Sequence, residues 1–110
     1  EKIPSEAFVW YKRAAREGSA YAMRKLGIMY KSGVGVEQNF ALALQWDKKG
    51  ALAGDALAAL GAGHIYFFGR GVEINYPEAF VWYEKAADLG EPEAMRDAGI
   101  MCAEGRGVPQ

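Results

Sequence analysis

Cys102 and His64 are the residues of this sequence whose types could form a nucleophile and its general base. They are the only cysteine and the only histidine among the 110 residues. A cysteine nucleophile needs its base within hydrogen-bond reach, yet these two residues belong to distant segments of the chain. We therefore expect Cys102 to pack in the core and His64 to be a surface or partly buried helix residue, and we expect no catalytic residue.

Other patterns that could carry chemistry are incomplete. No serine is followed by lysine three positions later, as a Ser-x-x-Lys nucleophile requires. Gly61-x-Gly63 begins like a dinucleotide-binding fingerprint, but Tyr66 stands where the third glycine belongs. A four-ligand zinc site would depend on one histidine, one cysteine and carboxylates. The sequence thus predicts a non-enzymatic protein with neither a cofactor nor a metal.

The overall charge excludes several classes of partner. The 13 basic and 14 acidic side chains leave a formal net charge of -1, and 51% of the residues are hydrophobic. Nucleic-acid binding needs clustered positive charge, and a membrane span needs a long apolar run, so we expect neither partner. The compartment stays open between the cytoplasm and, if a leader was removed, the periplasm or the exterior.

An internal repeat is the most informative feature of the sequence. Trp10, Trp46 and Trp82 are the only tryptophans, and they recur at a constant interval of 36 residues. The same shift aligns twelve of the 14 glycines in four columns, which are Gly18, Gly54, Gly90; Gly27, Gly63, Gly99; Gly33, Gly69, Gly105; and Gly35, Gly71, Gly107. A fixed period of this length is typical of solenoid proteins.

Each repeat contains two helical patterns separated by a glycine-rich turn. Residues 22–30 place their apolar side chains on one stripe of a helix, which we term the A helix, and residues 40–51 do so again in the B helix. Asn39 and Asn75 stand where the B helices need N-caps, and glycines follow these helices where a left-handed residue is needed. The sequence predicts an all-α fold, an α/α superhelix of antiparallel helix pairs.

The repeat columns resemble those of the Sel-one-like repeat (SLR) family, a relative of the tetratricopeptide repeat. The match rests on Ala22, Leu26, Gly27, Tyr30, Gly33, Gly35, Val36, Ala43, Trp46, Ala51 and Gly54. The resemblance implies a right-handed superhelix that serves as an adaptor in multiprotein assemblies, often in bacteria. It also implies that the chain is part of a longer SLR protein.

Cysteine-rich members of that family pair two cysteines in each unit and include proteins described as β-lactamases. At the corresponding positions this sequence has Ala15 with Met23, Ala51 with Ala59, and Ala87 with Met95. The resemblance therefore implies a disulfide-free member. A hydrolase of the cysteine-rich kind remains an alternative function, and so does a purely architectural spacer.

We expect a single SLR solenoid over residues 1–110. Residues 1–18 form the B helix of a preceding repeat, 19–54 and 55–90 are repeats, and 91–110 are an A helix and turn. Both ends then expose faces that would meet a neighbouring repeat, which predicts head-to-tail self-association. The residues at that junction would be Phe8, Trp10 and Tyr11 at one end and Met95, Ile100 and Met101 at the other.

Function in a solenoid is expected in the columns that vary, because the invariant ones are explained by packing. By resemblance to tetratricopeptide arrays, the varying stripe of the A helices lines a concave groove that binds a peptide or protein segment. It comprises Tyr21, Arg24, Ile28, Lys31, Leu57, Leu60, His64, Phe67, Phe68, Glu93, Arg96 and Ile100. The alternative for Phe67 and Phe68 is that both pack beneath the turn at residues 69–71.

Overall fold

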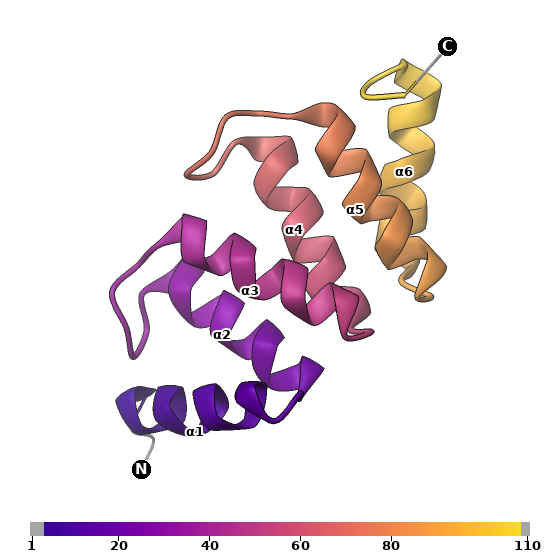
Figure 1. Ribbon diagram of the computed structural model, residues 1–110. Coiled ribbons are helices and arrows are strands. Elements are labelled where there is room, and N and C mark those ends of the chain that lie inside the picture. Colours follow the sequence, from indigo (N-terminus) through magenta and orange to yellow (C-terminus); the bar gives the residue numbers. More distant parts are fainter. Residues whose placement is uncertain (1–3, 109–110) are drawn as a thin grey trace.

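The computed structural model describes residues 4–108, which form six helices of 13 residues each and no strand. The helices are α1 (Pro4–Arg16), α2 (Ala20–Ser32), α3 (Phe40–Leu52), α4 (Ala56–Phe68), α5 (Tyr76–Asp88) and α6 (Pro92–Glu104). They stack in sequence order into an elongated body of 49 × 25 × 22 Å (Figure 1). The predicted all-α solenoid of helix pairs is confirmed, with α2, α4 and α6 as A helices and α1, α3 and α5 as B helices.

Polar side chains fix the start of each helix from α2 to α6. Asn39 and Asn75 accept hydrogen bonds from the backbone of residues Leu42 and Glu78, which confirms both as the predicted N-caps of α3 and α5. Ser19, Asp55 and Glu91 share a repeat column and cap α2, α4 and α6 in the same way. A side-chain oxygen at this position satisfies backbone N–H groups that no helical carbonyl can reach.

Each helix packs against the helix before it and the helix after it, and α2 also touches α4. Small residues allow the backbones to approach closely, since Ala22, Ala58 and Ala94 are almost completely buried. Larger apolar side chains fill the layers between them, as Leu26, Ile65 and Met101 do. The core is therefore a series of small clusters along the stack. None of the described helices is both long enough and apolar enough to cross a membrane.

Two successive layers of the stack use different chemistry at equivalent positions. Tyr83 of α5 covers Gly63 of α4, and its ring packs near Phe67 with 6.2 Å between centroids. One repeat earlier, Asp47 of α3 covers Gly27 of α2, and Lys31 Nζ lies 2.8 Å from Asp47 Oδ2. The aromatic pair of Tyr83 and Phe67 in one layer is thus replaced by an ion pair at the equivalent positions of the other layer.

Gly61 has a structural role that the repeat period does not explain. Residues Lys25 and Asp97 occupy its column in the other units, so Gly61 is not a repeat glycine. A Cβ at Gly61 would lie 2.6 Å from Asp47 Oδ2 and 2.8 Å from Lys31 Nζ. The glycine therefore makes room for the ion pair, and of Gly61 and Gly63 only Gly63 belongs to a repeat column.

Candidate functional site

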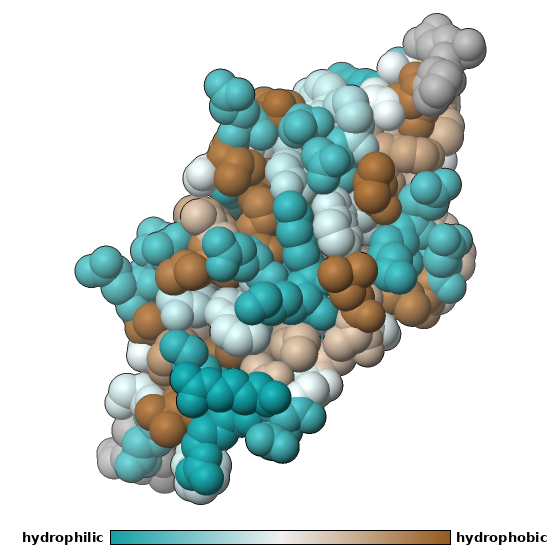
Figure 2. Space-filling view, in the orientation of Figure 1, coloured by the Kyte–Doolittle hydropathy of each residue, from teal (hydrophilic) through white to brown (hydrophobic). Residues whose placement is uncertain are grey.

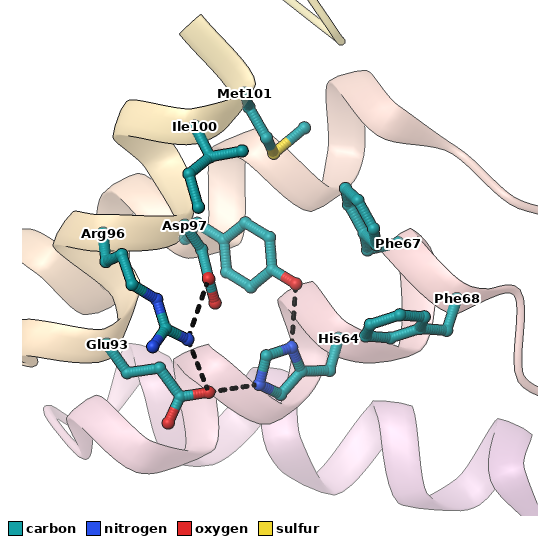
Figure 3. Close-up of a pocket in the computed structure, with 9 residues that line it drawn as sticks. His64, Phe67, Phe68, Glu93, Arg96, Asp97, Ile100 and Met101 are labelled. Atoms are coloured by element: carbon teal, nitrogen blue, oxygen red, sulfur yellow. Dashed lines mark hydrogen bonds and ion pairs between the residues drawn. The ribbon is translucent and has the colours of Figure 1, made fainter. Parts of the chain in front are cut away.

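A hollow of about 390 Å³ lies between α4, α5 and α6, and both polar and apolar side chains line it. Figure 3 shows labelled side chains of α4 and α6 on opposite sides of the hollow. Helix α5 contributes Tyr83 to the lining. The lining residues are His64, Phe67, Phe68, Tyr83, Glu93, Arg96, Asp97, Ile100 and Met101. Six of them belong to the predicted groove stripe, so the structure gathers half of that stripe around one hollow.

A chain of polar contacts joins the three helices on one side of the hollow (Figure 3). His64 Nδ1 lies 2.8 Å from the hydroxyl of Tyr83, and His64 Nε2 lies 3.1 Å from Glu93 Oε2. Arg96 closes the chain, with its guanidinium 4.0 Å from Glu93 and 3.3 Å from Asp97. Both ring nitrogens of the histidine are therefore engaged, one by a phenol and the other by a carboxylate.

The environment of Tyr83 keeps its hydroxyl protonated. Burial raises the pKa of the Tyr83 phenol well above its usual value, and the negative charges of Asp97 and Glu93 raise this pKa further. Both effects disfavour the phenolate, because an anion loses hydration when it is buried and is repelled by carboxylates. The phenol thus remains a hydrogen-bond partner that holds the His64 ring in place.

The other side of the hollow is an apolar shelf built from α4 and α6. Phe67 packs against Tyr76 with 5.1 Å between ring centroids and is half-buried. Phe68 lies edge-on to Phe67 at 5.0 Å and 6.0 Å from the His64 ring, yet 58% of it is exposed. Ile100 of α6 is also exposed. Phe67 thus packs among aromatic rings of α4 and α5, and the alternative of packing beneath the turn is wrong for the exposed Phe68.

The remaining stripe residues do not join this hollow. Arg24 pairs with Asp55 at 3.1 Å, and Lys31 pairs with Asp47. Ile28 lines a separate hollow beside α1, while Tyr21 and Leu57 are exposed. The charges of Arg24 and Lys31 thus serve to hold neighbouring helices together.

Leu60 contradicts its predicted place in the groove. It is 7% exposed and belongs to a hydrophobic cluster with residues from all four helices α3 to α6. Its column holds Arg24 and Arg96 in the other units. A long arginine can extend from this column to solvent or to a carboxylate, whereas a leucine folds down onto its neighbours. Leu60 is therefore a core residue.

Three residues that line the hollow lie outside the predicted groove stripe. Tyr83 lies on a B helix, and the expected groove contained A-helix positions only. Asp97 and Met101 lie on α6 at positions that the predicted stripe does not include. The sequence did hold a signal for Asp97, because its column changes from lysine to glycine to aspartate and is thus a varying one.

The structure does not bring Cys102 and His64 together in the hollow. Cys102 is exposed on α6 and does not line it. The expected core position of Cys102 is therefore wrong. In the same column, the ring of Tyr30 packs with Ala43 and Leu44 of the B helix that follows it. Among residues 4–108 no B helix follows α6, so Cys102 lacks the packing partners that Tyr30 has in this part of the chain.

Comparison with protein families and known structures identifies the repeat. The model of the Sel1 repeat matches residues 4–19, 20–55, 54–91 and 92–110. The chain belongs to the Sel1 repeat family. None of the curated proteins compared with the chain matches it. Sel1 repeats are generally protein-interaction scaffolds and typically non-catalytic.

Two solved structures of proteins with this repeat fold resemble nearly the whole chain. A Sel1 repeat protein from Oxalobacter formigenes is 37% identical, with a TM-score of 0.91 over 99% of this chain and 45% of its own. The protective antigen c5321 of uropathogenic Escherichia coli is 36% identical, with a TM-score of 0.87. This match covers 94% of this chain and 22% of the antigen. This Sel1 repeat chain thus spans less than half of either protein.

A cysteine-rich relative shows the same fold at lower identity. Cysteine-rich protein B of Helicobacter pylori is 30% identical, with a TM-score of 0.76 over 80% of this chain and 66% of its own. In the Sel1 repeat chain, two of the positions implied to correspond to paired cysteines are Ala51 and Ala59. Both are fully buried in one hydrophobic cluster. Apolar packing occupies these positions without a disulfide.

Proposed function

We propose that this Sel1 repeat chain is a non-enzymatic interaction module that binds a peptide or protein segment in the hollow between α4 and α6. The observation that supports this most strongly is the exposed Phe68, which stands on an apolar shelf beside the polar chain from His64 to Arg96. An apolar centre next to charged groups is how binding hot spots are built. An exposed aromatic ring in a hollow favours a binding surface over a plain spacer, which needs no such ring.

Exposed apolar side chains also occur elsewhere on the surface, for example Ile28 and Val34 in the hollow beside α1. Figure 2 shows one face of the molecule, on which hydrophobic side chains alternate with hydrophilic ones and form no continuous surface. Val81 on α5 lies outside the hollow between α4 and α6, in a smaller hollow beside Leu52 and Trp82, and 51% of it is exposed. Val81 therefore provides a matched control for Phe68.

The first prediction concerns binding at Phe68. Peptides selected from a random displayed library on the immobilised chain should bind Phe68→Ala more weakly than the wild type, by about fivefold or more, since hot-spot truncation costs roughly 1 kcal/mol or more. Val81→Ala should bind like the wild type. Calorimetric titration measures the affinities, and thermal melts should show similar midpoints because Phe68 is mostly exposed. Equal affinities of wild type and Phe68→Ala would contradict the proposed site.

We propose in addition that the 110-residue polypeptide self-associates head to tail. Asp47 and Tyr83 cover Gly27 and Gly63, but a Cβ at Gly99 would meet no atom within 4 Å. Met95 and Cys102 are exposed beside Gly99. Tyr11 on α1 occupies the column of Asp47 and Tyr83, so α1 of a second copy can cover Gly99. Met101, expected at this junction, is buried in the core, and Ile100 lines the hollow between α4 and α6.

The second prediction tests this contact. Light scattering should show a mean mass that rises with concentration, because a heterologous contact can repeat from copy to copy. Gly99→Arg should reduce this rise by placing a large charged side chain in the contact. A strict monomer at every concentration, or a rise that Gly99→Arg leaves unchanged, would contradict the arrangement.

A further inference from the structure

Three side chains of the hollow between α4 and α6 place metal-binding atoms close together. One nitrogen of His64 and one carboxylate oxygen each from Glu93 and Asp97 all lie within 4.8 Å of one another. His64 comes from α4, and the two carboxylates are one turn apart on α6, so they share one face of that helix. The arrangement joins two A helices of successive repeats across the hollow (Figure 3).

We propose that His64, Glu93 and Asp97 form a binding site for one divalent transition-metal ion, and that zinc is the ion that fits it best. One imidazole nitrogen with two carboxylate oxygens is a donor set that zinc accepts readily. Zinc binds such atoms at about 2.0 to 2.2 Å, which in a tetrahedral site separates neighbouring ligand atoms by about 3.3 Å. His64 Nε2 and Glu93 Oε2 are 3.1 Å apart, close to this spacing, and one Asp97 oxygen belongs to the same group of atoms within 4.8 Å.

The contact of His64 with Tyr83 prepares the ring for this role. In metal sites a ligating histidine usually bonds through its second ring nitrogen to a neighbouring group, which fixes the tautomer and the ring orientation. Here Nδ1 lies 2.8 Å from the Tyr83 hydroxyl, and this leaves Nε2 for the metal. Tyr83 is itself 2% exposed and packs over Gly63, so its position is well determined.

Arg96 is the group that competes with a metal ion at this place. Its guanidinium lies 3.3 Å from Asp97 and 4.0 Å from Glu93, where it compensates both carboxylates. The Arg96 side chain is 66% exposed, so it can swing into solvent with little rearrangement. Removing Arg96 should therefore strengthen metal binding, which is the opposite of what loss of a ligand would do.

The third prediction is measured by titrating Zn²⁺ into the chain against a chromophoric chelator at a pH of about 7.5. The wild type should bind one Zn²⁺ per chain. His64→Ala and Asp97→Asn should each lower the affinity by about 10- to 100-fold or more, given that loss of even a supporting contact costs this much. Arg96→Ala should raise the affinity. Co²⁺ should produce visible absorption bands in the wild type that His64→Ala lacks.

Two control variants separate this site from other groups that can hold zinc. Cys102→Ser removes the exposed thiol, and Glu104→Gln removes an exposed carboxylate of α6 outside the hollow. Both should leave the affinity for Zn²⁺ unchanged, and circular dichroism should show that every variant is helical. Absence of Zn²⁺ binding, equal binding by His64→Ala, loss with Cys102→Ser, or weaker binding by Arg96→Ala would each overturn the proposal. The titration needs no peptide, so its outcome does not depend on the proposed peptide site.

Discussion

The Sel1 repeat chain should gain about 2 to 3 kcal/mol of stability from Asp47 when the pH is lowered from about 7 to about 4. Burial raises the pKa of the Asp47 carboxyl from 3.8 to about 6, although the neighbouring Lys31 partly lowers it again. A carboxyl with a raised pKa in the folded state contributes its full stability below the unfolded pKa. That contribution is lost as the pH rises through the folded value, at about 1.4 kcal/mol for each pH unit that separates the two pKa values.

The physical cause is the position of Asp47 in the layer between α2, α3 and α4. Its side chain is 1% exposed, and among the described residues Lys31 Nζ is the only cationic group within 4 Å. The free energy needed to remove a carboxylate from water exceeds the attraction that one partly exposed lysine provides. The aspartate is therefore more easily buried in its neutral form.

Urea unfolding of the wild type and Asp47→Asn across this pH range measures the effect. As the pH rises, the wild type should lose about 2 to 3 kcal/mol more of its free energy of unfolding than Asp47→Asn does. The other titrating groups are common to both proteins, so their effects cancel in this comparison. Lys31→Met should make the loss larger and extend it to higher pH, because removing the compensating charge raises the folded pKa of Asp47 further. A difference that stays constant with pH would show that Asp47 titrates normally in the folded chain.

Replacing Gly63 by alanine should destabilise the fold by about 1 to 3 kcal/mol, whereas the same change at Gly99 should not. A Cβ at Gly63 would lie 2.5 Å and 2.6 Å from two ring carbons of Tyr83, a ring that is itself buried and cannot move freely. Forcing a methyl group into a packed layer costs this much. At Gly99 a Cβ meets no atom within 4 Å, and alanine favours a helix over glycine by about 1 kcal/mol.

The two variants form a matched pair because both glycines occupy the same column of the repeat and the same face of an A helix. Thermal and urea unfolding, at concentrations where the chain is monomeric, should place Gly63→Ala below the wild type and Gly99→Ala at or above it. If both changes stabilised the chain equally, the close contact of Tyr83 with α4 would be disproved.

The repeat period predicted the architecture well because it reports on contacts that every unit must make. Asn39 and Asn75 cap their helices as expected, and Gly18, Gly54 and Gly90 have the positive φ that their columns indicated. These features depend on a few neighbouring residues and on stacking that recurs every 36 residues. Local rules therefore suffice for them.

The side-chain environments were harder to predict, because a column fixes a backbone position and not the path of the side chain. Leu60 shares a column with two arginines and is nevertheless buried. Lys31 and Asp47 lie in different helices, and only their contact shows that the lysine serves the core and not the groove. The sequence did contain a hint, since Phe67 and Tyr83 occupy the same two columns one repeat later. The two columns thus change together.

The most direct test of peptide binding between α4 and α6 is an NMR titration of the isotope-labelled chain with a selected peptide. The proposed site predicts shifts in the backbone amides of Phe68, Arg96 and Ile100, which surround the hollow between α4 and α6. The amide of Val81, which lies outside this hollow, should not shift. Shifts confined to Val81 and its neighbours on α5, with none at Phe68 or Ile100, would contradict peptide binding in the hollow.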